Sequence, residues 1–143
     1  MIVVDTTVLV YAVGEDHPLR EPCRALVAAI AEARLEATTT VEVIQEFVHV
    51  RARRRDRQDA AERGRELLRL LHPLLTPGEA ELALGLKLFE ERVGLGPFVA
   101  ILAATTMLSG ATGLVSVDRA FAGVPGLTWL DPAGPEVQQL VGG

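Results

Sequence analysis

Three acidic residues that lie far apart in the sequence, Asp5, Glu46 and Asp118, are of the type that binds divalent cations. Hard cations such as Mg²⁺ prefer oxygen ligands, and proteins usually hold them with a few carboxylates while several waters stay bound. Such ions promote the cleavage of phosphodiesters, because they create a water nucleophile, stabilise the charged transition state and hold the leaving oxygen. If the fold brings these three side chains together, they would form the site of a metal-dependent nuclease.

Each acid on its own also has an ordinary structural explanation. Asp5 and Asp118 each follow a short apolar run and precede a helical pattern, where an aspartate can simply cap the helix. Glu46 lies within a helical pattern, where it would usually be a solvent-exposed residue. Its helical face carries Glu42, Gln45, Glu46 and His49. The set of three acids is therefore more informative than any one of them.

The elements that would position these acids follow from the hydrophobic pattern. Short apolar runs predict buried strands, and apolar residues at a spacing of three or four predict helices. Thr40 is a good N-cap for the helix that carries Glu46, and Thr39 is an equal alternative. The predicted strands cover residues 2–4, 36–39, 74–76, 114–117 and 127–130. The predicted helices cover residues 6–13, 19–34, 41–54, 57–71, 77–93 and 97–109.

Strands that alternate with helices predict an α/β fold with a mainly parallel sheet. The length of 143 residues predicts one domain over residues 1–143, with a tail rich in proline and glycine at its periphery. In parallel sheets, ligands bind beyond the carboxyl ends of the strands. Asp5 and Asp118 are both expected directly after strands, at the end of the sheet where such a site forms.

Composition limits the class of protein. Apolar residues make up 49% of the chain and charged residues 23%, as expected for a folded globular protein. The start of the chain has no basic segment, and the most apolar stretch, residues 99–108, is too short for the ~20 residues of a membrane-spanning helix. The single cysteine, Cys23, excludes an internal disulfide. We therefore expect a soluble, cytoplasmic protein.

Charge and metal-ligand spacing narrow the choice further. The net charge of −5 argues against tight unassisted binding of a polyanion, although bound cations would offset the acids. One basic run could contact RNA phosphates or form an ordinary solvated helix end, and we name Arg51, Arg53, Arg54 and Arg55 as its candidate contacts. The three histidines lack the spacing of a zinc site, and no glycine-rich phosphate-binding loop is present.

Three segments resemble the motifs of PIN domains. The opening IVVDTTVLVYA resembles a PIN-domain start, TTTVEVIQEFVHV its second motif with Glu46, and LVSVDRAF its last motif with Asp118. Together they extend over almost the whole chain, and the second segment looks most like VapC toxins of toxin–antitoxin pairs. The resemblance implies a three-layer α/β/α fold with a short, mainly parallel sheet flanked by helices. It also implies that Thr6 and Ser116 occupy the hydroxyl positions near the acids, where they could orient a carboxylate or water. The ordinary alternatives are helix capping by Thr6 and strand packing by Ser116.

The resemblance departs from the family pattern at one position. The family carries an aspartate at the start of the helix that reads GPFVAILAATTML here, and Val99 occupies that position. Valine can be a natural loss in a repurposed relative or a deliberate substitution that silences a toxic nuclease. Because valine supplies no ligand and adds apolar bulk, we predict weak Mg²⁺ binding and little nuclease activity. Glu42, one helical turn from Glu46, could reach the cation as a partial replacement.

The resemblance implies an endoribonuclease toxin that hydrolyses RNA phosphodiesters with Mg²⁺ or Mn²⁺. Asp5, Glu46 and Asp118 would be its catalytic and metal-binding residues, and Glu46 could act as a ligand or as a base. The implied partners are a VapB-like antitoxin, the RNA substrate and a second copy of the chain in a homodimer. The alternatives are a silent PIN module, which binds antitoxin or RNA without cutting, and a nuclease of this fold that cuts DNA.

Overall fold

The computed structural model describes residues 1–143, with a four-stranded, fully parallel sheet at its centre. The sheet has the strand order β2-β1-β3-β4, so the first strand of the chain lies in its interior, next to a strand more than a hundred residues later. The strands are β1 (Ile2–Val4), β2 (Ala37–Thr38), β3 (Gly113–Val115) and β4 (Trp129–Leu130). The predicted parallel sheet is confirmed.

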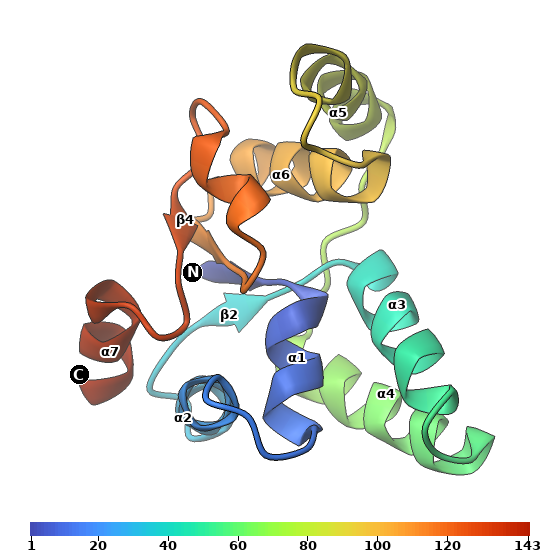
Figure 1. Cartoon of the computed structure of the whole chain (residues 1–143), viewed down its shortest axis with the longest axis vertical. Helices are drawn as coiled ribbons and strands as arrows, with labels where there is room; N and C mark the ends of the chain where they lie inside the picture. Colours follow the sequence, from blue (N-terminus) through green and yellow to red (C-terminus); the bar gives the residue numbers. More distant parts are fainter.

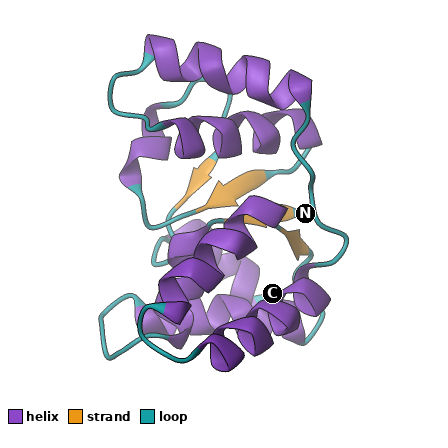
Figure 2. Cartoon of the chain, turned by 90° about the vertical axis from the view of Figure 1, so that its right-hand side faces the viewer, coloured by secondary structure: helices purple, strands orange, loops and turns teal.

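Helices cover both faces of this sheet, which gives three layers (Figures 1 and 2). In both views the pair α5 and α6 lies on one side of the strands, and the remaining α-helices lie on the other. None of these helices combines the length and the apolar character needed to cross a membrane. The helices are α1 (Thr6–Val13), α2 (Arg20–Ala31), α3 (Val41–Ala52), α4 (Arg57–Leu71), α5 (Glu79–Glu91), α6 (Pro97–Ser109) and α7 (Pro135–Gly142), with a 3₁₀ helix η1 (Arg119–Gly123).

The core lies between these layers, and aliphatic side chains dominate it. All three residues of β1 and all three of β3 are buried. A strand that is covered on both faces needs a continuous apolar run rather than an alternating one, and the sequences IVV and GLV meet that need. The two largest fully buried side chains are Phe47 and Phe121, from α3 and η1.

Local signals fix several helix boundaries where the sequence predicted them. The Thr40 side chain accepts a hydrogen bond from the Val43 backbone N–H, so Thr40 rather than Thr39 caps α3. The Asp56 side chain caps α4 in the same way, through the Asp59 N–H. Pro97 occupies the first turn of α6, and Gly110, with a φ of 78°, ends that helix in the left-handed conformation that glycine tolerates best.

Four details of the predicted elements were wrong. Residues 74–76 form no strand, and only an isolated bridge joins Leu75 to Thr40. Helix α5 begins at Glu79 rather than Pro77, because Gly78 is its N-cap. The Gly78 backbone N–H donates a hydrogen bond to the Glu81 carboxylate. Strand β3 ends at Val115, which leaves residues 116 and 117 as an irregular link to Asp118.

The tail is the fourth difference. The proline- and glycine-rich end of the chain forms α7, which packs against α2, with Val137 fully buried. The Arg34 guanidinium donates a hydrogen bond to the backbone carbonyl of Val141. Pro135 suits the first turn of a helix, because its missing N–H would have no partner there, so a proline of this tail starts a helix.

Candidate active site

A cavity of about 650 Å³ opens beyond the carboxyl ends of β1 and β3. Its walls include Asp5, Glu46 and Asp118, the three acids that the sequence singled out, and also Val99. These four residues come from the end of β1, from α3, from the segment after β3 and from α6. Positions spread over more than a hundred residues of sequence therefore face one space, whose volume is typical of sites that enclose a small ligand.

Asp5 is the most buried of the three acids, with 5% of its surface exposed. It directly follows β1, and its backbone N–H donates to the Val115 carbonyl at 3.0 Å, which extends the pairing of β1 with β3. Its Oδ2 accepts hydrogen bonds from Ser116 Oγ at 2.6 Å and from Thr7 Oγ1 at 3.0 Å. Although Asp5 stands at the N-cap of α1, its side chain makes no capping bond.

The environment of Asp5 raises the pKa of its carboxyl group. Burial is the largest cause, because removal from water disfavours the charged form. The hydrogen bonds from Ser116 and Thr7 oppose this shift, and the nearby negative charge of Asp118 adds to it. When Asp5 is ionised, hydroxyl groups balance its buried charge only in part, and no basic side chain forms an ion pair with it.

Ser116 connects Asp5 to Asp118. Its Oγ donates to Asp5 and accepts a hydrogen bond from the backbone N–H of Asp118 at 2.9 Å. The Asp118 side chain accepts from the Ala120 N–H at 2.9 Å and so caps η1. Both explanations of Asp118 therefore apply at once, since a carboxylate that caps a helix with one oxygen also lines the cavity.

Thr7 makes the hydroxyl contacts that the resemblance assigned to Thr6. The Thr6 hydroxyl is buried and has no hydrogen-bond partner. The Thr7 hydroxyl donates to Asp5, lies 3.3 Å from Ser116 Oγ and accepts from the Val117 N–H at 3.1 Å. Two adjacent threonines gave no sequence signal to separate these roles, because the direction in which α1 leaves β1 decides them.

Glu46 projects from α3 as an exposed side chain on the cavity wall. Glu42, the suggested replacement ligand, does not line this cavity. It lines a separate hollow of about 90 Å³ beside Phe98 and Ile101, and its buried Oε2 has no hydrogen-bond partner. The idea that Glu42 joins the acidic site is therefore not supported by the fold.

Val99 occupies the third position of α6, half-buried in the cavity wall. The first turn of α6 contains no acidic residue. A helix N-terminus carries a partial positive charge that favours carboxylates, so this position is electrostatically suited to an acid. The branched apolar side chain instead removes water from one side of the space between the three acids.

The donor set fits a hard cation only in part. Asp5 and Asp118 interact electrostatically, and a divalent cation would relieve the buried charge of Asp5 with the oxygen ligands that Mg²⁺ prefers. However, nowhere in the chain do three or more His, Cys, Asp or Glu side chains lie together in a group that could hold a metal ion. The predicted gathering of three acids is thus a shared cavity rather than a preformed cluster of ligands.

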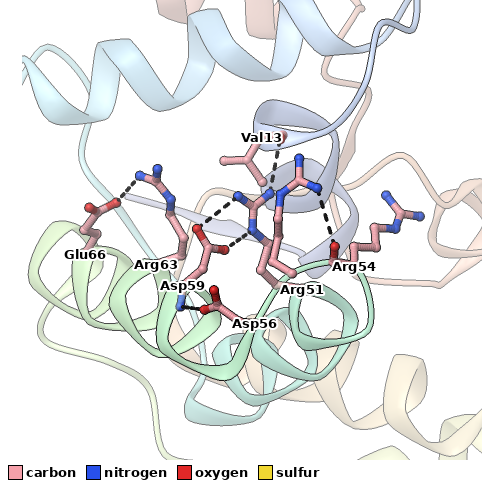
Figure 3. A network of polar contacts seen from close by, with 8 residues as sticks. Val13, Arg51, Arg54, Asp56, Asp59, Arg63 and Glu66 are labelled. Carbon is pink, nitrogen blue, oxygen red and sulfur yellow. Dashed lines mark hydrogen bonds and ion pairs between the residues drawn. The ribbon is translucent and has the colours of Figure 1, made fainter.

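The basic run is divided between structural and accessible residues. Arg51 is tied to Asp59 by an ion pair of 2.7 Å, and its guanidinium also contacts the Val13 carbonyl at 3.5 Å (Figure 3). This pair joins α3, α4 and the end of α1, so Arg51 is not free for RNA. Arg54 forms no ion pair and lines the acidic cavity, whereas Arg53 and Arg55 are exposed outside it.

The Arg51–Asp59 pair predicts a dependence of stability on acidic pH. The hydrogen bond from Arg51 lowers the pKa of Asp59 in the folded protein below its usual 3.8, so this pair stabilises the fold fully above pH 3.8. That stability is lost as the pH falls toward the lowered value. We expect Asp59→Asn to have a smaller drop in melting temperature between pH 6 and pH 3 than the parent. Glu66→Gln, which removes an exposed ion pair of the same helix, is the control. Equal drops in Asp59→Asn and the parent would contradict the expectation.

The cavity contains residues that the sequence did not single out. Two further acids, Glu15 and Asp16, line it, and so do the rings of Tyr11, His17 and Phe98. Arg54 is its only lysine or arginine. One signal was present, since Thr7, Tyr11 and Gly14 follow each other at intervals of four and three along α1 and so share a helical face.

Comparison with known proteins places this geometry in a family. A family model described as the PIN domain matches residues 2–127. The chain is 54% identical, over 143 residues and 99% of both chains, to "Ribonuclease VapC7" of Mycobacterium tuberculosis strain H37Rv. It is 32% identical, over 124 residues, to "Ribonuclease VapC23" of the same species, with 85% of this chain and 96% of the relative covered.

Proposed function

Because the chain belongs to the PIN-domain family and is of the VapC type, we propose that its cavity is the site of a metal-dependent endoribonuclease toxin. One observation carries this proposal: Asp5, Glu46, Asp118 and Val99 line the same cavity at the carboxyl ends of the strands. Two relatives bear the name ribonuclease, which agrees with RNA as the substrate. We further propose that Val99 leaves this particular chain weak or inactive.

The residues of the cavity suit distinct roles in such a reaction. Asp5 and Asp118 would hold Mg²⁺ or Mn²⁺, which when bound supplies an activated water and stabilises the charge that develops on the phosphate. Glu46 would complete the ligand set or accept the proton of the attacking water. Ser116 and Thr7 hold the Asp5 carboxylate in one orientation through hydrogen bonds of 2.6 and 3.0 Å. The Thr6 hydroxyl is buried and has no hydrogen-bond partner, so it takes no part in this set of roles.

The proposed impairment follows from charge and shape. Asp5 and Asp118 alone offer few ligands, and Mg²⁺ is strict about its octahedral shell and loses its waters reluctantly. A valine at position 99 adds neither a ligand nor an acceptor for those waters. The cavity also holds five carboxylates against one arginine, so without bound cations it repels the phosphates of RNA.

An RNA cleavage assay tests the function. Total RNA is incubated with the chain and with its Val99→Asp variant, each in Mg²⁺ or Mn²⁺ and each in EDTA. We expect fragments from the variant in the presence of metal, and few or none from the parent. A variant as inactive as the parent would instead favour a PIN module that binds without cutting. Cleavage of single-stranded DNA at an equal rate would identify a nuclease that does not distinguish RNA.

We also propose a small VapB-like antitoxin as the partner and a homodimer as the state of the toxin. The acid-lined cavity would accept a basic side chain from the antitoxin, and helix α5 carries exposed Leu82, Leu86 and Phe89 at helical spacing, a surface suited to contact with a second copy. Light scattering of the chain alone is expected to give twice the monomer mass, and Leu86→Glu a monomer. A parent that stays monomeric at high concentration would contradict the dimer.

Residues 1–143 would act as one PIN domain, although the family model ends at residue 127. The support is α7, whose Val137 is fully buried and which packs against α2. Action in the cytoplasm is part of the same proposal. The single cysteine, Cys23, is free and buried, and its pKa is raised to about 12 by burial, as suits a structural thiol that needs no oxidising compartment.

A further inference from the structure

Aromatic rings are scarce in this chain, yet they gather at the acidic cavity. The sequence contains one tyrosine, one tryptophan and four phenylalanines. The tyrosine, Tyr11, lines the cavity together with Phe98 and the imidazole ring of His17. Phe98 is 38% exposed, so part of its ring is accessible from the solvent. The catalytic roles proposed above use none of these three rings.

Tyr11 and His17 form a pair of rings that the backbone holds in place. Their ring centroids lie 4.7 Å apart, with 42° between the ring planes. The Leu19 backbone N–H donates to His17 Nδ1 at 3.1 Å, which fixes the orientation of the imidazole. Tyr11 is half-buried on α1, on the helical face that also presents Thr7 to the cavity. The pair is therefore an ordered aromatic surface beside the acids, named here the Tyr11–His17 shelf.

The charge of the cavity indicates which part of a nucleotide this shelf accepts. Glu15 and Asp16 precede His17 and also line the cavity, so a phosphate at this end would meet two further negative charges. A nucleobase is uncharged and planar and loses nothing to that repulsion. Proteins that recognise single-stranded RNA commonly stack splayed-out bases on Tyr, Phe or His rings. The Arg54 guanidinium, which forms no ion pair and lines the same cavity just beyond the end of α3, suits the phosphate.

We propose that the Tyr11–His17 shelf stacks a base of the RNA next to the bond that is cut. This inference rests on the proposed function and assigns two substrate-positioning residues that the catalytic roles do not include. Tyr11 lies six residues along α1 from Asp5, or about 9 Å at 1.5 Å per residue. With a rise of ~3.4 Å for stacked nucleotides, the base on the shelf lies within about three nucleotides of the cleaved phosphate.

The test measures binding rather than cleavage, and it uses the parent chain, which is expected to leave RNA intact. A short single-stranded RNA is titrated into the protein while NMR follows the ring protons of Tyr11, whose signals are unambiguous because there is one tyrosine. We expect upfield ring-current shifts, and an affinity about tenfold lower in Tyr11→Leu and in His17→Ala. Tyr11→Phe, which keeps the ring, should bind as the parent does. Leu140→Ala, which removes an exposed apolar side chain of α7 outside the cavity, is the control.

Three ligands separate the shelf from simple charge attraction. A duplex of the same sequence and an RNA with abasic sites keep the phosphates but offer no free base, and both should bind about tenfold more weakly. A single-stranded DNA shows whether the shelf distinguishes the sugar. Unchanged affinity in Tyr11→Leu, or equal binding of the abasic RNA, would overturn the proposal. Cleavage by Val99→Asp is measured separately. If Val99→Asp cuts RNA and Tyr11→Leu binds RNA as the parent does, the shelf proposal is wrong and the nuclease proposal stands. If Val99→Asp does not cut and Tyr11→Leu binds RNA more weakly, the nuclease proposal is wrong and the shelf proposal stands.

Discussion

Val99→Asp is expected to raise metal-dependent RNA cleavage by about 100-fold or more over the parent chain. The substitution places a carboxylate on the cavity wall that Asp5, Glu46 and Asp118 already line. A further oxygen donor can bind the cation or one of its waters, and the loss of such a group in metal sites typically costs tenfold to 100-fold in affinity or activity. The effect on the rate adds to this, because the cation stabilises the charged transition state.

The fold should accept this acid at little cost. Position 99 is half-buried and lies in the first turn of α6, where a carboxylate gains about 0.3–1 kcal/mol from the helix dipole. The matched control is Val99→Asn, which has nearly the same shape as Val99→Asp but no charge. We expect Val99→Asp, and not Val99→Asn, to show a rise in melting temperature when Mn²⁺ is added. Equal cleavage by both variants would show that removal of the valine, rather than addition of a charge, restores activity.

Asp5→Asn is expected to stabilise the metal-free protein and to abolish the activity gained by Val99→Asp. Burial raises the pKa of Asp5 in the folded state above its usual 3.8, so the protein loses stability as the pH rises from 3.8 through the raised value. An asparagine carries no charge and can still accept hydrogen bonds from Ser116 and Thr7. At pH 7 we therefore expect a gain of about 1 kcal/mol in the free energy of unfolding.

Urea unfolding of parent and Asp5→Asn at pH 4 and pH 7 measures this effect, with the gain larger at pH 7. Asp16→Asn, which removes an exposed acid from the same cavity, should change stability by less than about 0.5 kcal/mol. In the Val99→Asp background, Asp5→Asn should reduce cleavage about 100-fold or more and remove the stabilisation by Mn²⁺. If the asparagine variant is less stable than the parent at pH 7, then Asp5 is a structural residue and its buried charge is well compensated.

The parts of the fold that local chemistry decides could be predicted from the sequence. Helix α4 covers the predicted residues Arg57–Leu71, and α6 covers the predicted residues Pro97–Ser109. The parallel sheet followed from short apolar runs between helices. The position of Asp5 after β1 was confirmed for the same reason, because an uninterrupted apolar run ends at a charged residue.

The roles of individual side chains at the site could not be predicted from the sequence, because they depend on contacts between distant segments. Whether Thr6 or Thr7 meets Asp5 depends on the register of β1 with β3 and on the path into α1. Arg51 and Arg54 belong to one basic run, yet Asp59 on the next helix pairs with Arg51 and leaves Arg54 at the cavity. The sequence alone does not show which arginine pairs with Asp59. Of the RNA contacts predicted for the whole basic run, Arg51 is therefore no longer a candidate.

The strand order has a consequence for the synthesis of the protein. Strand β1 leaves the ribosome well before one of its two neighbours, β3, because β3 and the acid that follows it are made more than a hundred residues later. A growing chain that has not reached residue 118 has neither the hydroxyl of Ser116 against Asp5 nor the second carboxylate of the pair. The cavity is therefore among the last features to form, and a chain that stops short of β3 lacks both Ser116 and Asp118.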